Sequence, residues 1–239
     1  MSTVMTPQTD TARQNMTPDE LSAVRWNENY DIKASTLWGE PPVPYASEWL
    51  KHLTVSGPVL DMPCGDGRNI VPLRSNDRTV LGADTSINAL RIARCRLDQL
   101  DWGAAITLLQ QDAFATSFVD NTFAAVFCWD LLGHLRDPEA PITELLRIVR
   151  PGGLVVGSVF STGDSTRGKD MRKIEGEEYM FAERFYFRFY NRGEVEKLID
   201  IPGTDLVSLE KTSWMEPPHE GYREYEHMHE SWAFVLRKR

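Results

Sequence analysis

The stretch VLDMPCGDGRN, residues 59–69, decides the fold. An apolar run ends in the acid Asp61, and a turn with Gly65 and Gly67 follows ahead of a helix-like segment. Glycine lacks a Cβ atom, so the backbone there can turn sharply and approach a ligand closely. The stretch therefore predicts a strand, a ligand-binding loop and a helix, although an ordinary strand-to-helix turn without a ligand has the same outline.

The residues around these glycines indicate which ligand fits. Dinucleotide-binding loops have a third glycine three residues after the second, and here Ile70 stands at that position. Asp66 also puts a negative charge into the loop, which disfavours a pyrophosphate. A cofactor without phosphates that carries an ammonium and a sulfonium group is electrostatically compatible with the loop.

Further apolar, β-branched runs bounded by turn residues predict strands at residues 58–62, 79–83, 105–109, 124–129 and 154–160. Helix-like stretches separate most of these runs. Ser86, for example, can cap a helix that carries Leu90 and Leu97, and apolar residues recur at helical spacing within 142–149. Because crossovers between parallel strands need such helices, the alternation predicts an α/β fold with helices on both faces of a parallel sheet.

The segments on either side of this alternation differ in composition. Residues 1–16 are expected to form a flexible tail, and Thr17 with Pro18 marks a helix start. After residue 160, a charged stretch (161–178), an aromatic cluster (179–190), a helix (194–200) and two strands (205–214 and 231–238) follow, with a polar connection at 215–230. We expect one domain over 17–239: an N-terminal lid (17–55), a cofactor-binding core (56–160), and a substrate-side insert with the C-terminal strands (161–239).

Charge and composition narrow the function. The net charge is −9 and the sequence pI is about 5.1. Nucleic-acid affinity rests on Lys and Arg, so a small-molecule partner is favoured over nucleic acid. No apolar run approaches the roughly 20 residues of a membrane span, and the N-terminal segment lacks the apolar stretch of a signal peptide. We therefore expect no membrane contact and a cytoplasmic location; the oligomeric state stays open.

Two more acids follow predicted strands. Asp84 closes the second strand, where its carboxylate can accept hydrogen bonds from both ribose hydroxyls. Asp112 follows the third strand, where it can accept a hydrogen bond from an adenine amine while Ala113 and Phe114 line the ring. Each acid alone fits a helix cap or a solvated turn. Three acids at three successive strand ends are harder to explain that way, because open parallel sheets bind ligands at this edge.

With these motifs in place, the chain resembles the class I S-adenosylmethionine-dependent methyltransferases from about Trp26 to the C-terminus. The matching pieces are the loop 59–69, Asp84, Asp112 with Ala113, the segment FCWDLLGHLRDP (127–138) and LLRIVRPGGLVVGSVF (145–160). Pro63 departs from the family, which often has its first glycine there; proline removes a backbone N–H that would contact the cofactor.

The resemblance implies a Rossmann-like, seven-stranded, mostly parallel sheet with an antiparallel last strand at 231–238. It also implies that the cofactor is S-adenosylmethionine, with S-adenosylhomocysteine as its product. The residues expected to bind this cofactor are Asp61, Pro63, Cys64, Gly65, Gly67, Asn69, Asp84, Thr85, Asp112, Ala113, Phe114, Cys128, Trp129 and Asp130.

Methyl transfer is an in-line displacement, so an enzyme mainly aligns the acceptor and excludes water. An acceptor that loses a proton needs a base, and His134, after the fourth strand, is the candidate catalytic residue. The alternative is that His134 caps or packs against the next helix. Three cysteines without a Cys-x-x-Cys pair indicate neither a disulfide framework nor a thiolate zinc site.

The acceptor site is expected in two segments. The N-terminal one resembles the lid of small-molecule members of the family, although a helix that only packs on the sheet edge is an equal alternative. His227 and His229 would share one face of an extended segment, but no third residue has metal-ligand spacing, so we predict no metal. The expected acceptor contacts are Trp26, Tyr30, Trp38, Tyr186, Tyr190, His219 and Tyr222.

These features together predict an enzyme that transfers a methyl group from S-adenosylmethionine to a small molecule, in natural-product biosynthesis for example. No Asn- or Asp-Pro-Pro-aromatic motif, which recognises amines of bases or of glutamine in related enzymes, follows the fourth strand. Other readings stay open: a protein or RNA methyltransferase, a sensor that binds the cofactor without turnover, and a nicotinamide dehydrogenase.

Overall fold

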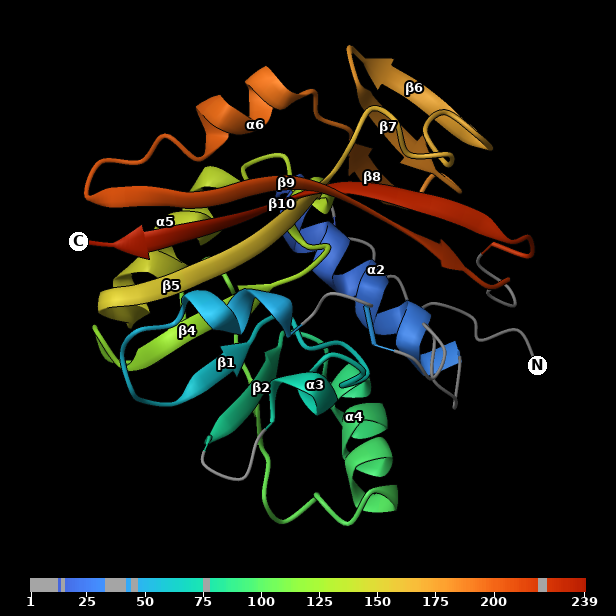
Figure 1. The fold of residues 1–239 in the computed structure, drawn as a ribbon. Coiled ribbons are helices and arrows are strands. Elements are labelled where there is room, and N and C mark those ends of the chain that lie inside the picture. The colour runs from blue at the N-terminus through green and yellow to red at the C-terminus, as the bar shows by residue number, and fades with distance from the viewer. Residues whose placement is uncertain (1–12, 14–15, 33–41, 44–46, 75–77, 219–222) are drawn as a thin grey trace.

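The computed structural model describes residue 13 and residues 16–32, 42–43, 47–74, 78–218 and 223–239. A seven-stranded sheet has the order β3-β2-β1-β4-β5-β10-β9, and a second sheet has the order β6-β7-β8 (Figure 1). The strands of the large sheet are β1 (Val59–Asp61), β2 (Val80–Asp84), β3 (Thr107–Gln110), β4 (Phe123–Cys128), β5 (Val149–Phe160), β9 (Thr204–Glu216) and β10 (His227–Lys238).

Strand directions confirm the predicted sheet. The strands β1 to β5 pair in parallel, whereas β10 lies between β5 and β9 and is antiparallel to both. Two strands begin earlier than expected, β5 at Val149 and β10 at His227. In β5, Gly152 adopts a φ of +78°, and the register to β4 shifts nearby, so the strand continues through the expected Pro-Gly-Gly turn.

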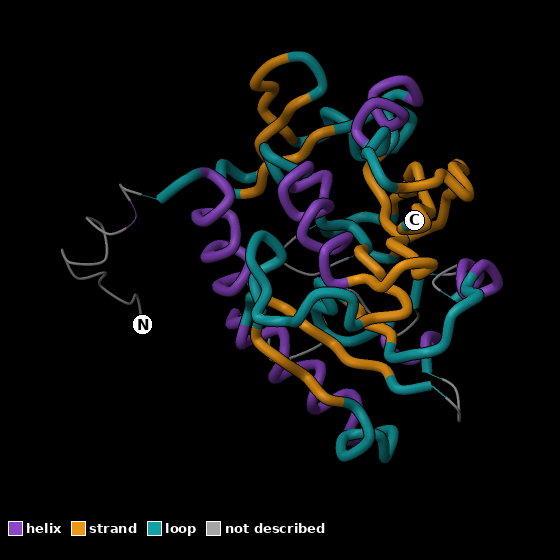
Figure 2. Tube along the Cα trace, turned by 90° about the vertical axis from the view of Figure 1, so that its left-hand side faces the viewer, coloured by secondary structure: helices purple, strands orange, loops and turns teal. Residues whose placement is uncertain are grey.

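Helices cover both faces of the large sheet, as the side view in Figure 2 shows. Alternate residues of one strand enter different cores: Leu60 belongs to a cluster with residues of α5 and α6, and Val59 to a cluster with residues of α3 and α4. The helices are α2 (Pro18–Ile32), α3 (Ile70–Leu73), α4 (Ile87–Gln99), α5 (Glu139–Ile148) and α6 (Arg192–Leu198), with 3-10 turns η1 (Glu48–His52) and η2 (Leu132–His134).

The aromatic cluster at 179–190 folds as part of the small sheet, which the sequence analysis did not predict. Its strands β6 (Met171–Glu175), β7 (Glu178–Phe181) and β8 (Phe185–Arg188) are all antiparallel. Phe185 and Phe187 are buried with Phe160, the last residue of β5. The small sheet is therefore joined to the large one at the edge where the strands β1, β2 and β4 end.

Helix α2 begins where the sequence predicted. The Glu20 backbone N–H donates to the Thr17 hydroxyl (3.2 Å), and the Thr17 N–H donates to the Glu20 carboxylate (2.7 Å), which together form a capping box. The helix is fastened to the rest of the molecule by side chains. Asn27 Oδ1 accepts a hydrogen bond from the Ser86 hydroxyl (2.9 Å), and Asp19 accepts one from the Arg136 N–H (3.0 Å).

Ser86 caps α4 as expected, because its hydroxyl oxygen accepts a hydrogen bond from the Ala89 N–H (3.0 Å). We predict that Ser86→Ala lowers the free energy of unfolding by about 1 kcal/mol, since the N–H and Asn27 both lose a partner. Urea denaturation measures the change. Ser213→Ala, on an exposed position of β9, is the control and should change the value by less than about 0.5 kcal/mol. Equal effects of the two substitutions would contradict the capping role.

Candidate active site

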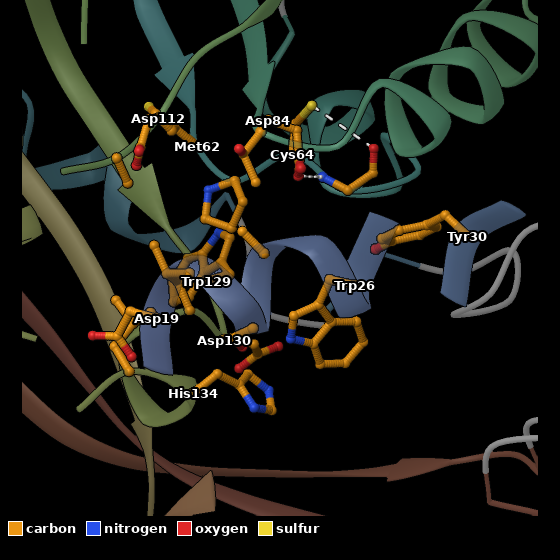
Figure 3. Close-up of a pocket in the computed structure, with 18 of the residues that line it drawn as sticks. Asp19, Trp26, Tyr30, Met62, Cys64, Asp84, Asp112, Trp129, Asp130 and His134 are labelled. Atoms are coloured by element: carbon orange, nitrogen blue, oxygen red, sulfur yellow. Dashed lines mark hydrogen bonds between the residues drawn. The ribbon is translucent and has the colours of Figure 1, made fainter. Parts of the chain in front are cut away.

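A cavity of about 560 Å³ lies at the carboxyl ends of β1, β2 and β4, with α2 as one wall. This volume is in the range of small-molecule sites, roughly 300–1,000 Å³. Figure 3 shows Asp84, Cys64 and Asp112 on one side of the cavity, and Asp130 and His134 on the opposite side. Helix α2 contributes Trp26 and Tyr30, which share one face because they are four residues apart.

The glycine loop is fastened to the end of β2. The Gly65 N–H donates to Asp84 Oδ2 (2.9 Å), and the Cys64 N–H donates to the Ala83 carbonyl (2.8 Å). Gly67 has a φ of +82°, and a Cβ on it would lie 3.1 Å from the Ala93 side chain, so this position requires glycine. The loop can therefore pass close to the cavity floor, as the sequence predicted.

Asp84 is a buried carboxylate with few neutralising neighbours. Burial raises its pKa to about 6, although hydrogen bonds from the Ser86 and Gly65 N–H groups act in the opposite direction. Asp66, which the sequence analysis treated as a repulsive charge in the loop, is instead buried and paired with Arg96 of α4 at 3.2 Å. Its negative charge still acts on the loop, because it contributes to the raised pKa values of Asp61, Cys64 and Asp84.

Asp61 is the clearest sign that a cationic ligand belongs here. Both carboxylate oxygens are buried, and neither has a hydrogen-bond partner among the described residues. Burial, together with the nearby charge of Asp84, raises the pKa of Asp61 well above its usual value. The charge of Arg68 offsets only part of this effect, and an ammonium group would supply the hydrogen-bond donors that the two oxygens lack, so the site fits the amino-acid end of S-adenosylmethionine.

On the adenine side, the predicted residues gather at the mouth of the cavity. Asp112 Oδ1 accepts a hydrogen bond from the Phe114 N–H (2.9 Å), which shapes the turn after β3. Asp112 is exposed and Ala113 is buried beneath it. Of the residues predicted to bind the cofactor, those that line the cavity are Pro63, Cys64, Gly65, Asn69, Asp84, Thr85, Asp112, Ala113, Phe114, Trp129 and Asp130.

Some predicted residues do not line the cavity. Cys128 is fully buried on the α5 side of the sheet, because alternate strand residues point to opposite faces. Tyr186 and Tyr190 are buried but do not line the cavity. The guanidinium of Arg136 lies over the ring of Tyr186, and that of Arg188 lies over the ring of Tyr190. Asp61 and Gly67 are not part of the lining themselves, although their neighbours Met62, Asp66 and Arg68 are. Trp38, His219 and Tyr222 lie outside the described residues.

His134 lines the cavity, but its surroundings are apolar. Its Nδ1 donates to the Tyr186 carbonyl (2.9 Å), and the rings of Trp26, Phe160 and Phe187 pack against it with centroids 4.4–5.2 Å away. Burial lowers the pKa of His134 to about 4. The imidazole is therefore neutral at physiological pH and would be a weak base; its catalytic role stays a prediction.

Several lining residues were not predicted from the sequence, because they come from distant segments. Arg68 donates to Glu216 of β9 (2.9 Å), and the Trp214 indole N–H donates to the same carboxylate (2.8 Å). This pair is nine-tenths buried and forms part of the lining, and Arg68 is close enough to Asp61 and Asp130 to favour their charged forms. The other unpredicted members of the lining include Met62, Gln111, Leu131, Phe160, Phe187, Arg223 and His229.

Comparison with known proteins agrees with this geometry. Residues 59–153 match the family model described as a methyltransferase domain. A ubiquinone biosynthesis O-methyltransferase of Thiobacillus denitrificans is 30% identical over 156 residues, which cover 63% of this chain and 66%, just under two thirds, of that protein. The chain is thus similar to S-adenosylmethionine-dependent methyltransferases, and the match to the methyltransferase domain extends over the strands that carry the acids of the cavity.

Solved structures support the fold. One, reported for the conversion of a disulfide bond into a thioacetal group during echinomycin biosynthesis, has a TM-score of 0.70 at 18% identity and covers 93% of this chain and 92% of its own. A second, the Burkholderia thailandensis 1,6-didemethyltoxoflavin-N1-methyltransferase with bound S-adenosylhomocysteine, has a TM-score of 0.61 at 14% identity and covers 100% of this chain and 92% of its own. No described helix combines the length and apolarity that a membrane span requires.

We predict that Asp84→Asn weakens binding of S-adenosylhomocysteine by about 1.5–3 kcal/mol, because hydrogen bonds to a charged acceptor are lost. Titration calorimetry measures the affinity. Asp200→Asn, at an exposed position after α6, is the matched control and should leave it unchanged. Unaltered affinity of the Asp84 variant would remove Asp84 from the proposed ribose contacts.

The raised pKa of Asp84 also predicts a pH dependence. The carboxylate is charged above a pH of about 6 and becomes protonated below it, which removes acceptor capacity. Affinity for S-adenosylhomocysteine should therefore fall by up to about tenfold per pH unit below this value. Because Asp61 and Asp130 also have raised pKa values, calorimetry should compare the wild type with Asp84→Asn. The variant should have a shallower profile; an identical profile would contradict the assignment.

Proposed function

We propose that the enzyme transfers a methyl group from S-adenosylmethionine to a small molecule that carries an apolar ring, in natural-product biosynthesis. The observation that carries this proposal is the division of the cavity into two halves. Acids from strand ends form one half, and aromatic side chains form the other, with Trp26, Phe160 and Phe187 around His134. An enclosed aromatic half suits a flat, apolar acceptor better than a protein or RNA segment.

The residues that would hold the cofactor follow from the geometry. Asp84 would accept the ribose hydroxyls, Asp112 and Phe114 would border the adenine, and Asp61 would face the ammonium group. When bound, S-adenosylmethionine supplies an electrophilic methyl group on a sulfonium. The chain's own contribution is to align the acceptor and to exclude water, because few obligatory catalytic groups are needed for an in-line displacement.

Helix α2 supports the exclusion of water. Tyr30 is buried, and its hydroxyl lies 2.9 Å from where a Cβ on Gly65 would stand, so the helix reaches the cofactor loop itself. Glu28 of α2 also forms an ion pair with Arg184 (2.9 Å), next to β8. We therefore interpret α2, the described helix of the expected lid (17–55), as a cover over both halves of the cavity.

A screen of candidate metabolites with methyl-labelled S-adenosylmethionine tests the proposal. We expect transfer to a ring-bearing acceptor and none in the Asp84→Asn variant at the same low donor concentration. Tight binding of the donor without transfer to any acceptor would instead favour a sensor. Transfer to protein or RNA but not to small molecules would overturn the acceptor class, which the net charge of −9 also argues against.

The role of His134 can be tested with the acceptor that the screen identifies. His134→Phe keeps an aromatic ring in place and removes both nitrogens. Because the imidazole is neutral and its pKa is about 4, we predict that kcat falls by less than about tenfold. Steady-state kinetics measures the change. A fall of about 100-fold or more, with unchanged affinity for S-adenosylhomocysteine, would show that His134 takes the acceptor's proton.

A further inference from the structure

A second histidine borders the cavity in a different environment. His229 of β10 lines the cavity, and its Nδ1 lies 2.8 Å from Oδ2 of Asp164, a buried residue in the turn after β5. On its other side, His229 Nε2 lies 3.2 Å from Nε2 of His227. The Nδ1 of His227 lies 2.9 Å from the Tyr225 carbonyl. These groups form one chain from Asp164 through two imidazoles to a backbone oxygen.

Asp164 is held as a charged carboxylate. Its Oδ1 accepts from the Thr166 N–H (2.8 Å) and hydroxyl (2.6 Å), and Oδ2 also accepts from the Glu230 N–H (3.0 Å). Burial alone opposes its charge, but the hydrogen bonds from His229 and Thr166 outweigh that effect and lower the pKa of Asp164. An ionised carboxylate can only accept hydrogen bonds, so His229 must donate from Nδ1.

Counting hydrogens in the chain shows what is unusual about it. The Tyr225 carbonyl and the Asp164 carboxylate both accept, so both Nδ1 atoms carry a hydrogen. A neutral imidazole has one N–H, so both Nε2 atoms are then bare, and their lone pairs face each other at 3.2 Å. One additional proton between the Nε2 atoms completes the third hydrogen bond and places an imidazolium beside a carboxylate. The neutral chain is therefore built to take up a proton.

The charges around His229 are compatible with this uptake. Negative and positive groups from several elements surround the ring. Two buried carboxylates, Asp164 and Asp130, interact with the charge of His229 and favour a positive ring. Burial lowers the pKa of His227, which favours the neutral form of that ring. The charged and titratable groups that face the pair are Arg68, Asp130, His134, Asp164, Glu216, Arg223, Tyr225 and Glu230.

We propose that the Asp164–His229–His227 chain takes up the proton that the acceptor releases as it is methylated. This inference rests on the proposed function and specifies its acceptor: a ring that carries an ionisable hydroxyl or thiol. X stands for the oxygen or sulfur of the acceptor. Its X–H bond breaks and leaves the electron pair on X, which forms the new bond to the methyl carbon. The bond between that carbon and the sulfonium sulfur breaks, and its electron pair stays on sulfur. The proton goes to Nε2 of His229, which shares it with Nε2 of His227. Asp164 is the positioning residue that stabilises the charged ring.

The tautomers give a test that needs no acceptor. The full chain, labelled with ¹⁵N-histidine and saturated with S-adenosylhomocysteine, is examined by two-bond ¹H–¹⁵N correlation between about pH 5 and pH 8. His227→Gln and His229→Gln assign the signals. We expect both rings to carry hydrogen on Nδ1 and to report one shared protonation, because coupled groups titrate as a pair. A hydrogen on Nε2 of His229, with none on Nδ1, would contradict the proposed hydrogen-bond arrangement and overturn the proposal.

Kinetics with the acceptor from the screen test the proton transfer itself. His229→Gln should lower kcat by about 100-fold and leave the affinity for S-adenosylhomocysteine within about twofold. In the wild type, kcat/KM should rise with pH as the pair loses its extra proton. Asp164→Asn removes the negative partner that stabilises the charged pair, so this rise should move to lower pH, and Asp164→Glu should restore it. The control His52→Gln changes a histidine on η1 outside the cavity lining.

The outcomes separate the two proposals. An unmoved pH profile in Asp164→Asn, in protein that still binds S-adenosylhomocysteine, would overturn the proton-transfer role. Loss of wild-type activity with a chelator and its recovery with zinc would replace the proton between the two Nε2 atoms by a metal ion. If the tautomers are as expected but no small molecule is methylated, the proposed function fails, while the protonation of the chain stands as an observation.

Discussion

The structure of the site depends on the buried carboxylate of Asp84, which accepts hydrogen bonds from two backbone N–H groups. Oδ2 holds the Gly65 N–H, and Oδ1 holds the Ser86 N–H at 2.8 Å. The residue that ends β2 thus fixes both the glycine loop after β1 and the start of α4. Ser86 in turn binds Asn27, so the same corner also positions the wall formed by α2.

The cofactor half of the cavity concentrates negative charge where water is excluded. Burial raises the pKa values of Asp61, Asp84 and Asp130, and the attraction of Arg68 offsets only part of this effect for Asp61 and Asp130. A methyl donor that carries a sulfonium and an ammonium group would supply positive charge to these acids. The opposite pattern holds for His134, whose burial among aromatic rings favours the neutral form. The cavity therefore holds buried acids with raised pKa values as well as an imidazole whose pKa is lowered.

The sequence predicts the large sheet and most of the residues that gather at its strand ends in the cavity, because strand ends, glycines and acids follow one another within short stretches. It did not predict the small sheet, although Phe185, Phe187 and Phe189 alternate, because the cluster was interpreted only as a wall. Nor did it predict the partners of Asp66 or His229. Asp164 and His229 are 65 residues apart, and such contacts depend on β10 entering the sheet beside β5.

This division has a consequence for where specificity lies. The matched methyltransferase model spans residues 59–153, which include Asp61, Asp84 and Asp130. The aromatic and histidine side chains of the other half come largely from α2, from the small sheet and from β10, all outside that range. The likeness to the family therefore supports the identity of the methyl donor. On the proposed function, the choice of acceptor depends instead on α2, the small sheet and β10, which lie outside the matched range. The proposed proton acceptor accordingly lies on β10, where His229 meets Asp164, and not on η2, which carries His134.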